Sequence, residues 1–471
     1  MNVNKKLQKP WIVQKFIGDK KFYQRVLFLA VPIMIQNGIT NFVSLLDNIM
    51  IGQIGTVQMS GASIVNQLIF VYFLCIFGAV SGAGIFTAQY YGKQDMQGIQ
   101  YTFRFKLLIS TVLTVLAIAL FCSMGDDLIA LYLSGEGKAS DAAAILRYGR
   151  EYLAIILIGL PAFMLGQTYA STLRECGETI LPMKAGLVAV FINLTFNYLL
   201  IFGKFGFPQL GVEGAAIATV LSRYVEAGII VVWTHLHKKK NPYIVGLYRS
   251  FYIPAGVMKN IIIKGTPLLF NEGLWASGVA MLTQCYSVRG LSVVASLNIA
   301  NTINNVFNVV FIALGDSVAI IVGQLLGAGE MKEARETDTK LIAFSVCSCI
   351  LIGMLMILFA PMFPMLYNTS SDVRHLATQI IMVSAIFMPQ SAFLHAAYFT
   401  LRSGGKTFIT FLFDSASIWC VSVPVVYVLS RFTGLSMIMI YVAYYLTETA
   451  KAMLGFILVK KGIWLQNIVK E

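Results

Sequence analysis

The sequence predicts an all-α integral membrane protein with twelve transmembrane helices in two parallel six-helix repeat lobes. Two observations carry this prediction, an apolar composition and an internal repeat. Hydrophobic residues make up 57% of the 471 residues, charged residues make up 12%, and the mean hydropathy is +0.75. A soluble domain carries about 25% charged residues because its surface faces water. The composition therefore indicates a chain that is surrounded largely by lipid.

The repeat appears as matching residues at a constant separation. Six pairs lie 235 positions apart, namely Pro32 and Pro267, Gly55 and Gly290, Asn66 and Asn301, Gln89 and Gln324, Gly92 and Gly327, and the acidic pair Asp95 and Glu330. Further along, Thr172-Leu173-Arg174 matches Thr400-Leu401-Arg402 at a separation of 228. A duplicated bundle of this kind is typical of secondary transporters, whose sites lie where the repeats meet.

Apolar runs give the individual helices, since about 20 residues span roughly 30 Å of hydrocarbon. The runs predict twelve helices, over residues 24–52, 59–91, 103–125, 148–174, 180–202, 211–235, 257–288, 294–327, 338–360, 375–402, 407–429 and 435–459. The first helix of each half contains a proline, Pro32 or Pro267, which predicts the same bend in both.

The positions of the basic residues predict the orientation. Most of the 35 Lys and Arg residues lie on one side of the predicted helices, so both termini are expected in the cytoplasm and the halves are parallel repeats. The predicted organisation is a basic N-terminal segment (1–23), an N-lobe (24–235), a basic cytoplasmic linker (236–256), a C-lobe (257–460) and a cytoplasmic tail (461–471). We expect a multi-pass protein of the cell membrane.

Several classes of function are excluded. The net charge of +13 is spread along the cytoplasmic rim without an aromatic platform, which favours contact with membrane lipids and not with nucleic acid. Seven cysteines form no disulfide or metal pattern. The chain has no HExxH, GxSxG or Walker A motif and no suitable GxGxxG, so we expect neither an enzyme nor a pump with its own nucleotide domain. A monomeric secondary transporter without a cofactor remains.

Polar residues inside the predicted helices are the candidate site. A carboxylate in the hydrocarbon costs roughly 2.5–3.5 kcal/mol and by default marks a functional position. Asp47, Glu272 and Asp414 are such residues, although Asp47 could lie at the outer interface and Asp414 could snorkel or form a structural pair. Asn193 and Asn197 are four residues apart and share a helical face, where they could bind a cation or join helices by hydrogen bonds.

The motifs of the chain resemble those of the multidrug and toxic compound extrusion (MATE) transporters. The resemblance covers almost the whole chain, through LLDNIMIGQIG, AQYYGKQD and GQLLGAGE, TLRECGET and TLRSGGKT, and NLTFNYLLIFGKFGFPQLGVEGAAIATV. It implies two six-helix lobes around a large cavity.

The resemblance also implies roles for individual residues. Asp47, Asn193, Asn197 and Thr219 match an N-lobe site that binds a cation or a proton, with Na+ possible at Asp47, Asn193 and Asn197. Several family members have an aspartate where Asn197 stands, so this site has one carboxylate where theirs has two. Glu272 matches a coupling glutamate of another branch, and Asp414 is an approximate match.

The expected function is Na+- or H+-coupled antiport that expels organic, cationic compounds. Expected drug contacts lie on the long helices that would line the cavity, at Gln36, Asn37, Asn66, Asn301 and Asn305. The alternative is a lipid-linked oligosaccharide flippase of the same superfamily. Its cavity would be cationic, whereas the expected cavity charges here are Asp47, Glu272 and Asp414, with Arg223 the main basic exception.

Overall fold

The protein is built from long helices joined by short turns. The computed structural model describes residues 15–133, 139–367 and 369–470, so the predicted N-terminal segment lies outside the described residues up to residue 14. The main helices are α2 (Lys20–Gly52), α3 (Thr56–Gly92), α4 (Met96–Leu131), α5 (Ala139–Glu175), α6 (Ile180–Phe202), α7 (Val212–Leu236), α8 (Ala255–Ser287), α9 (Leu291–Ala328), α10 (Met331–Phe359), α11 (Ser371–Ser403), α12 (Thr407–Phe411), α13 (Val423–Phe432) and α14 (Met437–Lys461).

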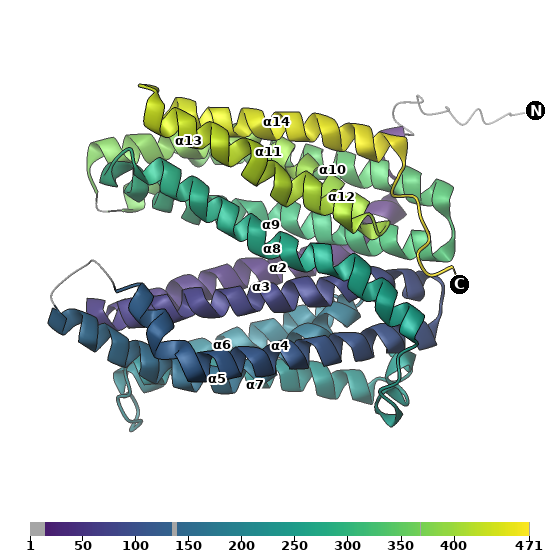
Figure 1. The fold of residues 1–471 in the computed structure, drawn as a ribbon, viewed down its shortest axis with the longest axis horizontal. Helices are drawn as coiled ribbons and strands as arrows, with labels where there is room; N and C mark the ends of the chain where they lie inside the picture. The colour runs from purple at the N-terminus through teal and green to yellow at the C-terminus, as the bar shows by residue number, and fades with distance from the viewer. Residues whose placement is uncertain (1–14, 134–138, 368, 471) are drawn as a thin grey trace, which may run out of the picture. The chain divides into compact units, whose positions relative to one another are not determined.

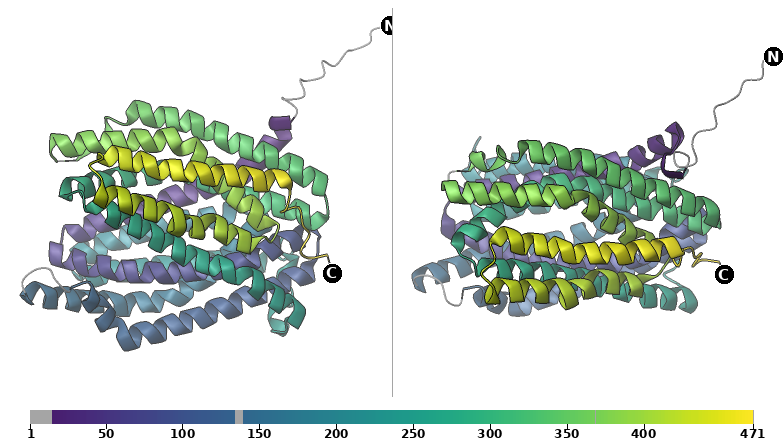
Figure 2. Two further views of the ribbon diagram at one scale, coloured as in Figure 1. Left: turned by 45° about the horizontal axis from the view of Figure 1, so that its top comes forward. Right: turned by 90° about the horizontal axis from the view of Figure 1, so that it is seen from above.

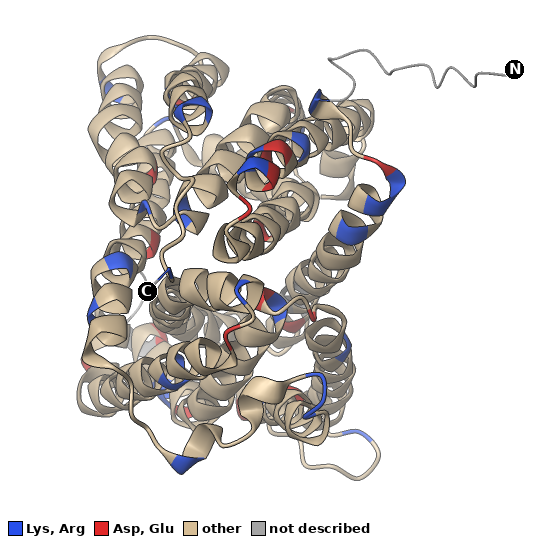
Figure 3. Ribbon diagram, turned by 90° about the vertical axis from the view of Figure 1, so that its right-hand side faces the viewer, with Lys and Arg blue, Asp and Glu red and all other residues tan. Residues whose placement is uncertain are grey.

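The fold class predicted from the sequence is confirmed. Within the described residues, 11 helices are long and apolar enough to cross a membrane, counting Thr407–Phe432 as one helix. The remaining predicted span, the seventh at 257–288, coincides with α8. Uncharged residues dominate the helices in Figure 3. The predicted helices at 103, 148 and 338 begin too late, because polar first turns extend each helix beyond its apolar run.

Local chemistry explains several helix ends. The Asp95 side chain accepts a hydrogen bond from Gly98 N and caps α4, while Ser370 and Ser436 cap α11 and α14 in the same way. Gly203 ends α6 with a φ of 63°, a left-handed conformation that glycine adopts without steric cost. The sequence thus places its turn residues where the apolar runs stop.

The chain divides into two compact units by its internal contacts. Unit 1 comprises Met1–Met34 and Trp275–Glu471, and unit 2 comprises Ile35–Leu274. Helices α3 to α7 pack together in unit 2 (Figure 1), and α9, α10, α11 and α14 pack together in unit 1 (Figure 2). The units differ from the predicted lobes at one point, because the first helix of each predicted lobe, α2 or α8, is divided between them.

The divided helices explain the unit boundaries. The start of α2 buries Val26, Leu29 and Ile33 in the apolar core of unit 1, which also contains Leu314 of α9. The start of α8 approaches α3 at Gly82 and Gly265. A Cβ built on Gly82 would lie 2.5 Å from the Gly265 Cα, so only glycine permits this approach.

The linker between α7 and α8 is folded onto unit 2. It contains two 3-10 turns, η1 (Pro242–Ile244) and η2 (Leu247–Arg249). Arg104 of α4 donates hydrogen bonds to the carbonyl oxygens of Leu247, at 2.9 Å, and Tyr252, at 3.1 Å. Tyr243 of η1 is buried, and burial raises the pKa of its hydroxyl, which therefore remains a neutral donor to Asn241 Oδ1.

Candidate functional site

Four of the predicted site residues come together in unit 2. Asn197 of α6 donates from Nδ2 to Asp47 Oδ1 of α2 at 2.6 Å and to Asn193 Oδ1 at 3.1 Å. Asn193 in turn donates from Nδ2 to Thr219 Oγ1 of α7 at 3.3 Å. Three helices therefore contribute one continuous polar chain, which we name the Asp47 cluster, and both asparagines are buried.

The Asp47 cluster has an unsatisfied oxygen at its centre. Asn197 uses its amide nitrogen for Asp47 and Asn193, and its own Oδ1 is buried without a hydrogen-bond donor in the described part of the chain. A buried acceptor without a donor costs roughly 1–3 kcal/mol, so such an atom calls for an explanation. Together with the Asp47 carboxylate and Thr219 Oγ1, it offers the hard oxygen atoms that bind small cations.

Two further groups surround the Asp47 cluster. Arg223 and Tyr152 lie close enough to Asp47 to interact with it electrostatically. Arg223 donates from Nη1 to Glu226 Oε2 at 3.0 Å, and this carboxylate compensates its charge. The Tyr152 hydroxyl donates to Asn66 Oδ1 at 3.3 Å, so one of the predicted drug contacts adjoins the same site.

Glu226 is a functional candidate that the sequence analysis missed. It lies in α7 with only 16% of its side chain exposed. A Cβ on Gly186 of α6 would lie 3.6 Å from Gln36 Cγ and 3.8 Å from Glu226 Oε1, so these two polar side chains approach the same point of α6. Glu226 lies three residues after Arg223, which the sequence analysis had named. Because residues three apart are neighbours on a helix, this spacing could have indicated the pair.

Glu272 and Asp414 do not take part in the hydrogen-bonded chain of the Asp47 cluster. Glu272 is half-buried in the part of α8 that belongs to unit 2, and its Cγ lies 3.4 Å from the point where a Cβ on Gly78 of α3 would stand. Asp414 belongs to unit 1, as do Asn301 and Asn305, which are exposed on α9. Asn37 is half-buried in the unit 2 part of α2.

Asp414 belongs to a charged cluster in unit 1. Lys451 of α14 donates from Nζ to Asp414 Oδ1 at 2.9 Å and lies 3.4 Å from Glu448 Oε2. The exposed fractions are 8% for Lys451, 18% for Asp414 and 11% for Glu448. Ser422 donates to Glu448 Oε1 at 3.4 Å. Asp414 and Ser422 lie in π-helical turns, Leu412–Ala416 and Ile418–Ser422, a geometry frequent at functional sites.

Arg223 is one of several buried or half-buried basic residues that pair with a carboxylate. Lys451 is a second, and Lys106 of α4 is a third. Lys106 is fully buried and donates to Glu175 Oε2 at 2.5 Å. Lys106, Arg223 and Lys451 thus each pair with a carboxylate, which removes their net charge locally.

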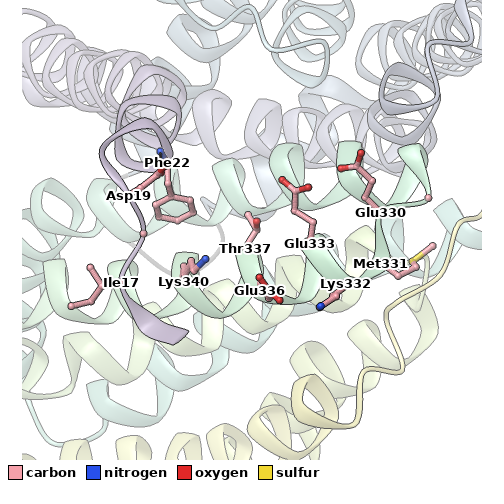
Figure 4. A pocket seen from close by; sticks show the side chains of 12 residues that line it. Ile17, Asp19, Phe22, Glu330, Met331, Lys332, Glu333, Glu336, Thr337 and Lys340 are labelled. Atoms are coloured by element: carbon pink, nitrogen blue, oxygen red, sulfur yellow. Dashed lines mark hydrogen bonds between the residues drawn. The ribbon is translucent and has the colours of Figure 1, made fainter. Parts of the chain in front are cut away.

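One pocket lies outside all of the predicted positions. Its volume is about 1080 Å³, and it is lined by the segment that leads into α2, by the α9–α10 turn and by the first turns of α10. In Figure 4, Glu330, Glu333 and Glu336 lie along the first turns of α10, while Asp19 and Phe22 lie at the start of α2. The described residues contain no group of three His, Cys, Asp or Glu side chains arranged to hold a metal.

The match to known families decides the identity of the chain. The MatE family model matches residues 32–199 and again residues 267–428, one match in each repeat and more than half of the chain together. The chain belongs to the MatE family. The match confirms the MATE resemblance of the motifs. This family consists of transporters and not of enzymes.

Relatives and solved structures agree with this MATE assignment over nearly the full length. The Probable multidrug resistance protein NorM of Thermotoga maritima is 25% identical over 95% of this chain and 94% of its own. The Probable multidrug resistance protein YoeA of Bacillus subtilis is 24% identical over 93% of both. An outward-facing multidrug resistance MATE family transporter superposes with a TM-score of 0.83 at 18% identity, over 96% of this chain and 98% of the other.

A fourth similar protein has the same fold, and a different function is suggested for it. The fold also superposes, with a TM-score of 0.83 at 18% identity and over 96% of this chain and 98% of the other, on a MOP superfamily transporter from Pyrococcus furiosus. That protein is described as having a binding pocket of reverse polarity that suggests a different function. The fold alone therefore does not select the substrate, and the charges of this chain must decide.

Proposed function

We propose that this MATE protein is a Na+- or H+-coupled antiporter that expels organic, cationic compounds across the cell membrane. The observation that carries the proposal is the Asp47 cluster, in which a carboxylate adjoins the unsatisfied Asn197 Oδ1. A cation placed there would receive oxygen ligands from α2, α6 and α7 together. Binding would therefore favour the arrangement of these three helices that brings the oxygens close.

Two forms of coupling fit the Asp47 cluster. For Na+, the ligands would be Asp47, Asn193, Asn197 and Thr219, with three neutral oxygens supplementing one carboxylate. For H+, the proton would bind to Asp47 itself, the sole carboxylate in the hydrogen-bonded chain. Antiport follows if the ion and the drug favour different states of the transporter, because each ligand then shifts the equilibrium against the other.

Glu272 and Asp414 are proposed as further positions for the cation or proton. Glu272 supports this role by its place midway along α8, where a charged side chain is costly without a function. Asp414 shares Lys451 with Glu448, so the cluster carries two carboxylates for one ammonium group. The excess negative charge gives this cluster the capacity for one additional cation.

The names of the relatives support an organic substrate, since several are multidrug resistance proteins. We propose Gln36, Asn37, Asn66, Asn301 and Asn305 as drug contacts. The paired state of Lys106, Arg223 and Lys451 argues against the flippase alternative, because a pyrophosphate would need cations that are not already neutralised. The proposal further includes cytoplasmic termini and a monomer in the cell membrane.

The test is drug efflux from inverted membrane vesicles under an imposed Na+ gradient or an imposed pH gradient. The unmutated protein should transport an organic cation under one of the two gradients. Asp47→Asn removes the only carboxylate of the Asp47 cluster. A Na+ site should then show a large rise in the Na+ concentration needed for half-maximal efflux, and a protonation site should lose its pH dependence.

Asp372→Asn is the matched control, since Asp372 is exposed in the first turn of α11 and its substitution should leave both titrations unchanged. Titrations of Asp47→Asn that match those of the unmutated protein would remove Asp47 from the coupling mechanism.

A further inference from the structure

Asp338 in α10 is a deeply buried carboxyl group outside every site described above. Its exposed fraction is 1%, and its side chain makes one hydrogen bond, in which Thr400 Oγ1 of α11 lies 2.6 Å from Asp338 Oδ1. An ionised carboxylate can accept about four hydrogen bonds, and burying one without a cation or several donors is strongly unfavourable. The surroundings of Asp338 therefore do not suit a charge.

Other charged groups do not compensate Asp338. The helices that pack with α10 are α9, α11 and the start of α2. Together with α10 they carry these charged side chains, histidines and tyrosines: Asp316 of α9; Lys332, Glu333, Arg335, Glu336 and Lys340 of α10; Asp372, Arg374, His375, His395, Tyr398 and Arg402 of α11; and Lys20, Lys21, Tyr23 and Arg25 of α2. Across the described residues, none of these forms an ion pair or a hydrogen bond with Asp338. Among the described residues, the polar group that contacts the carboxyl is a neutral hydroxyl, that of Thr400.

Thr400 Oγ1 makes two short polar contacts, and these indicate whether the Asp338 carboxyl carries a proton. Thr400 Oγ1 also lies 2.9 Å from the carbonyl oxygen of Ala396, one turn earlier in α11. A threonine hydroxyl has one hydrogen and can donate to only one of these two acceptors. If Asp338 is a carboxylic acid, it donates to Thr400, Thr400 donates to Ala396, and both short contacts are satisfied. If Asp338 is ionised, one of the contacts is made without a hydrogen.

The N-terminal repeat contains the same pair of hydrogen bonds at the matching threonine, and there the donor is unambiguous. Thr172 and Thr168 are the counterparts of Thr400 and Ala396 at the separation of 228. There, Lys106 donates from Nζ to Thr172 Oγ1 at 3.1 Å, and Thr172 donates to the carbonyl oxygen of Thr168 at 3.0 Å. An ammonium group has only hydrogens to offer, so this threonine must accept from its partner and donate to its own helix.

The C-terminal repeat lacks the ion pair of Lys106 with Glu175 that adjoins Thr172 in the N-terminal repeat. Lys106 corresponds to Leu341 at the separation of 235, and its partner Glu175 corresponds to Ser403 at 228. Asp338 is thus the group that fills the donor's role beside Thr400. A neutral acid can do so, whereas a carboxylate cannot.

We propose that Asp338 is a proton-binding site, in which the carboxyl takes up one proton from water and holds it as a hydrogen-bond donor to Thr400. The site is separate from the Asp47 cluster and needs no bound Na+. Loss of the proton leaves a charge that the closed α10–α11 contact cannot solvate. Release of the proton therefore requires water to reach Asp338 through a separation of α10 and α11.

Infrared spectroscopy of the intact protein in lipid vesicles tests this directly, because a carboxylic acid and a carboxylate absorb in different regions. The difference spectrum between the unmutated protein and Asp338→Asn at neutral pH should show the loss of one carboxylic acid carbonyl band. Asp372→Asn, which alters an exposed carboxylate, should show no loss in that region. Loss of carboxylate bands alone in Asp338→Asn would overturn the proposal.

Thr400→Val keeps the test decisive if Asp338→Asn fails to fold, since it leaves the carboxyl in place. A protonated Asp338 then loses its hydrogen-bond acceptor, and its carbonyl band should shift to higher frequency. An unchanged carboxylic acid region in Thr400→Val would contradict the proposal. Neither measurement requires transport, so the result is independent of whether drug efflux and its coupling are as proposed above.

Discussion

Asn197 donates a hydrogen bond to Asp47 at 2.6 Å while its own amide oxygen has no donor among the described residues. The amide therefore fixes the carboxylate and at the same time leaves an acceptor open beside it. This combination suits a cation that both oxygens can share. It also makes Asn197 the residue through which the charge of the Asp47 cluster can be changed with the least change in shape.

The first prediction changes that charge. Asn197→Asp replaces a donor with a second carboxylate beside Asp47, and two carboxylates so close cannot both remain ionised without a cation. We expect tighter binding of the coupling ion, with the concentration for half-maximal efflux lowered by about tenfold, which corresponds to roughly 1.4 kcal/mol. Gln209→Glu adds a carboxylate in an exposed turn and serves as the control. Equal ion titrations for both variants would contradict the prediction.

The second prediction concerns Glu272. Glu272→Gln keeps the shape of the side chain against α3 but cannot ionise, so gradient-driven efflux should fall to background while membrane abundance stays near normal. Efflux from vesicles and quantitative immunoblotting provide the two measurements. Glu336→Gln, at an exposed position of α10, should retain efflux. If Glu272→Gln transports normally, Glu272 has a structural role only.

The third prediction tests the orientation with two positions at opposite ends of α7. In a variant whose native cysteines are replaced, Lys239→Cys lies in the linker and Phe205→Cys lies in the exposed turn before α7. An impermeant thiol reagent added to intact cells should label Phe205→Cys and spare Lys239→Cys, because the basic linker is expected in the cytoplasm. The reverse pattern would invert the predicted topology.

One part of the geometry of the Asp47 cluster could be predicted from the sequence, because it follows from helical spacing. Asn193 and Asn197, four residues apart, were expected on one face and are hydrogen-bonded to each other. Their convergence with Asp47 and Thr219 required three helices to meet, which no local pattern contains. That part of the prediction came from the family resemblance, and the roles of the four residues remain a proposal.

Asp338 and Lys451 escaped prediction for physical reasons. The predicted helix 338–360 begins at Asp338, whereas polar residues extend α10 back to Met331, and Asp338 is buried within the helix. Lys451 lies within the predicted span 435–459, eight residues before its end. Its partner Asp414 is 37 positions earlier in the chain, so the pair exists only through tertiary packing.

The fourth prediction concerns the contact of Gly82 with Gly265. Gly82→Ala places a methyl group against the backbone of α8, where no flexible side chain can give way. We expect a loss of about 1–3 kcal/mol of stability from overpacking, seen as a lower unfolding temperature in detergent. Gly256→Ala in α8 has open space around its Cβ and should be neutral or slightly stabilising. Equal unfolding temperatures would show that α3 and α8 separate readily at this point.

The fifth prediction concerns the ammonium group of the Asp414 cluster. Lys451→Met leaves Asp414 and Glu448 largely buried without their shared cation, and breaking a buried pair in this way costs about 3–5 kcal/mol. The unfolding temperature should therefore fall, and adding Asp414→Asn to Lys451→Met should recover part of the loss, because it removes one of the two uncompensated charges. Lys460→Met, at an exposed position of the same helix, is the control. If Lys451→Met unfolds at the same temperature as Lys460→Met, the ion pair does not hold α14 against the π-helical turn that carries Asp414.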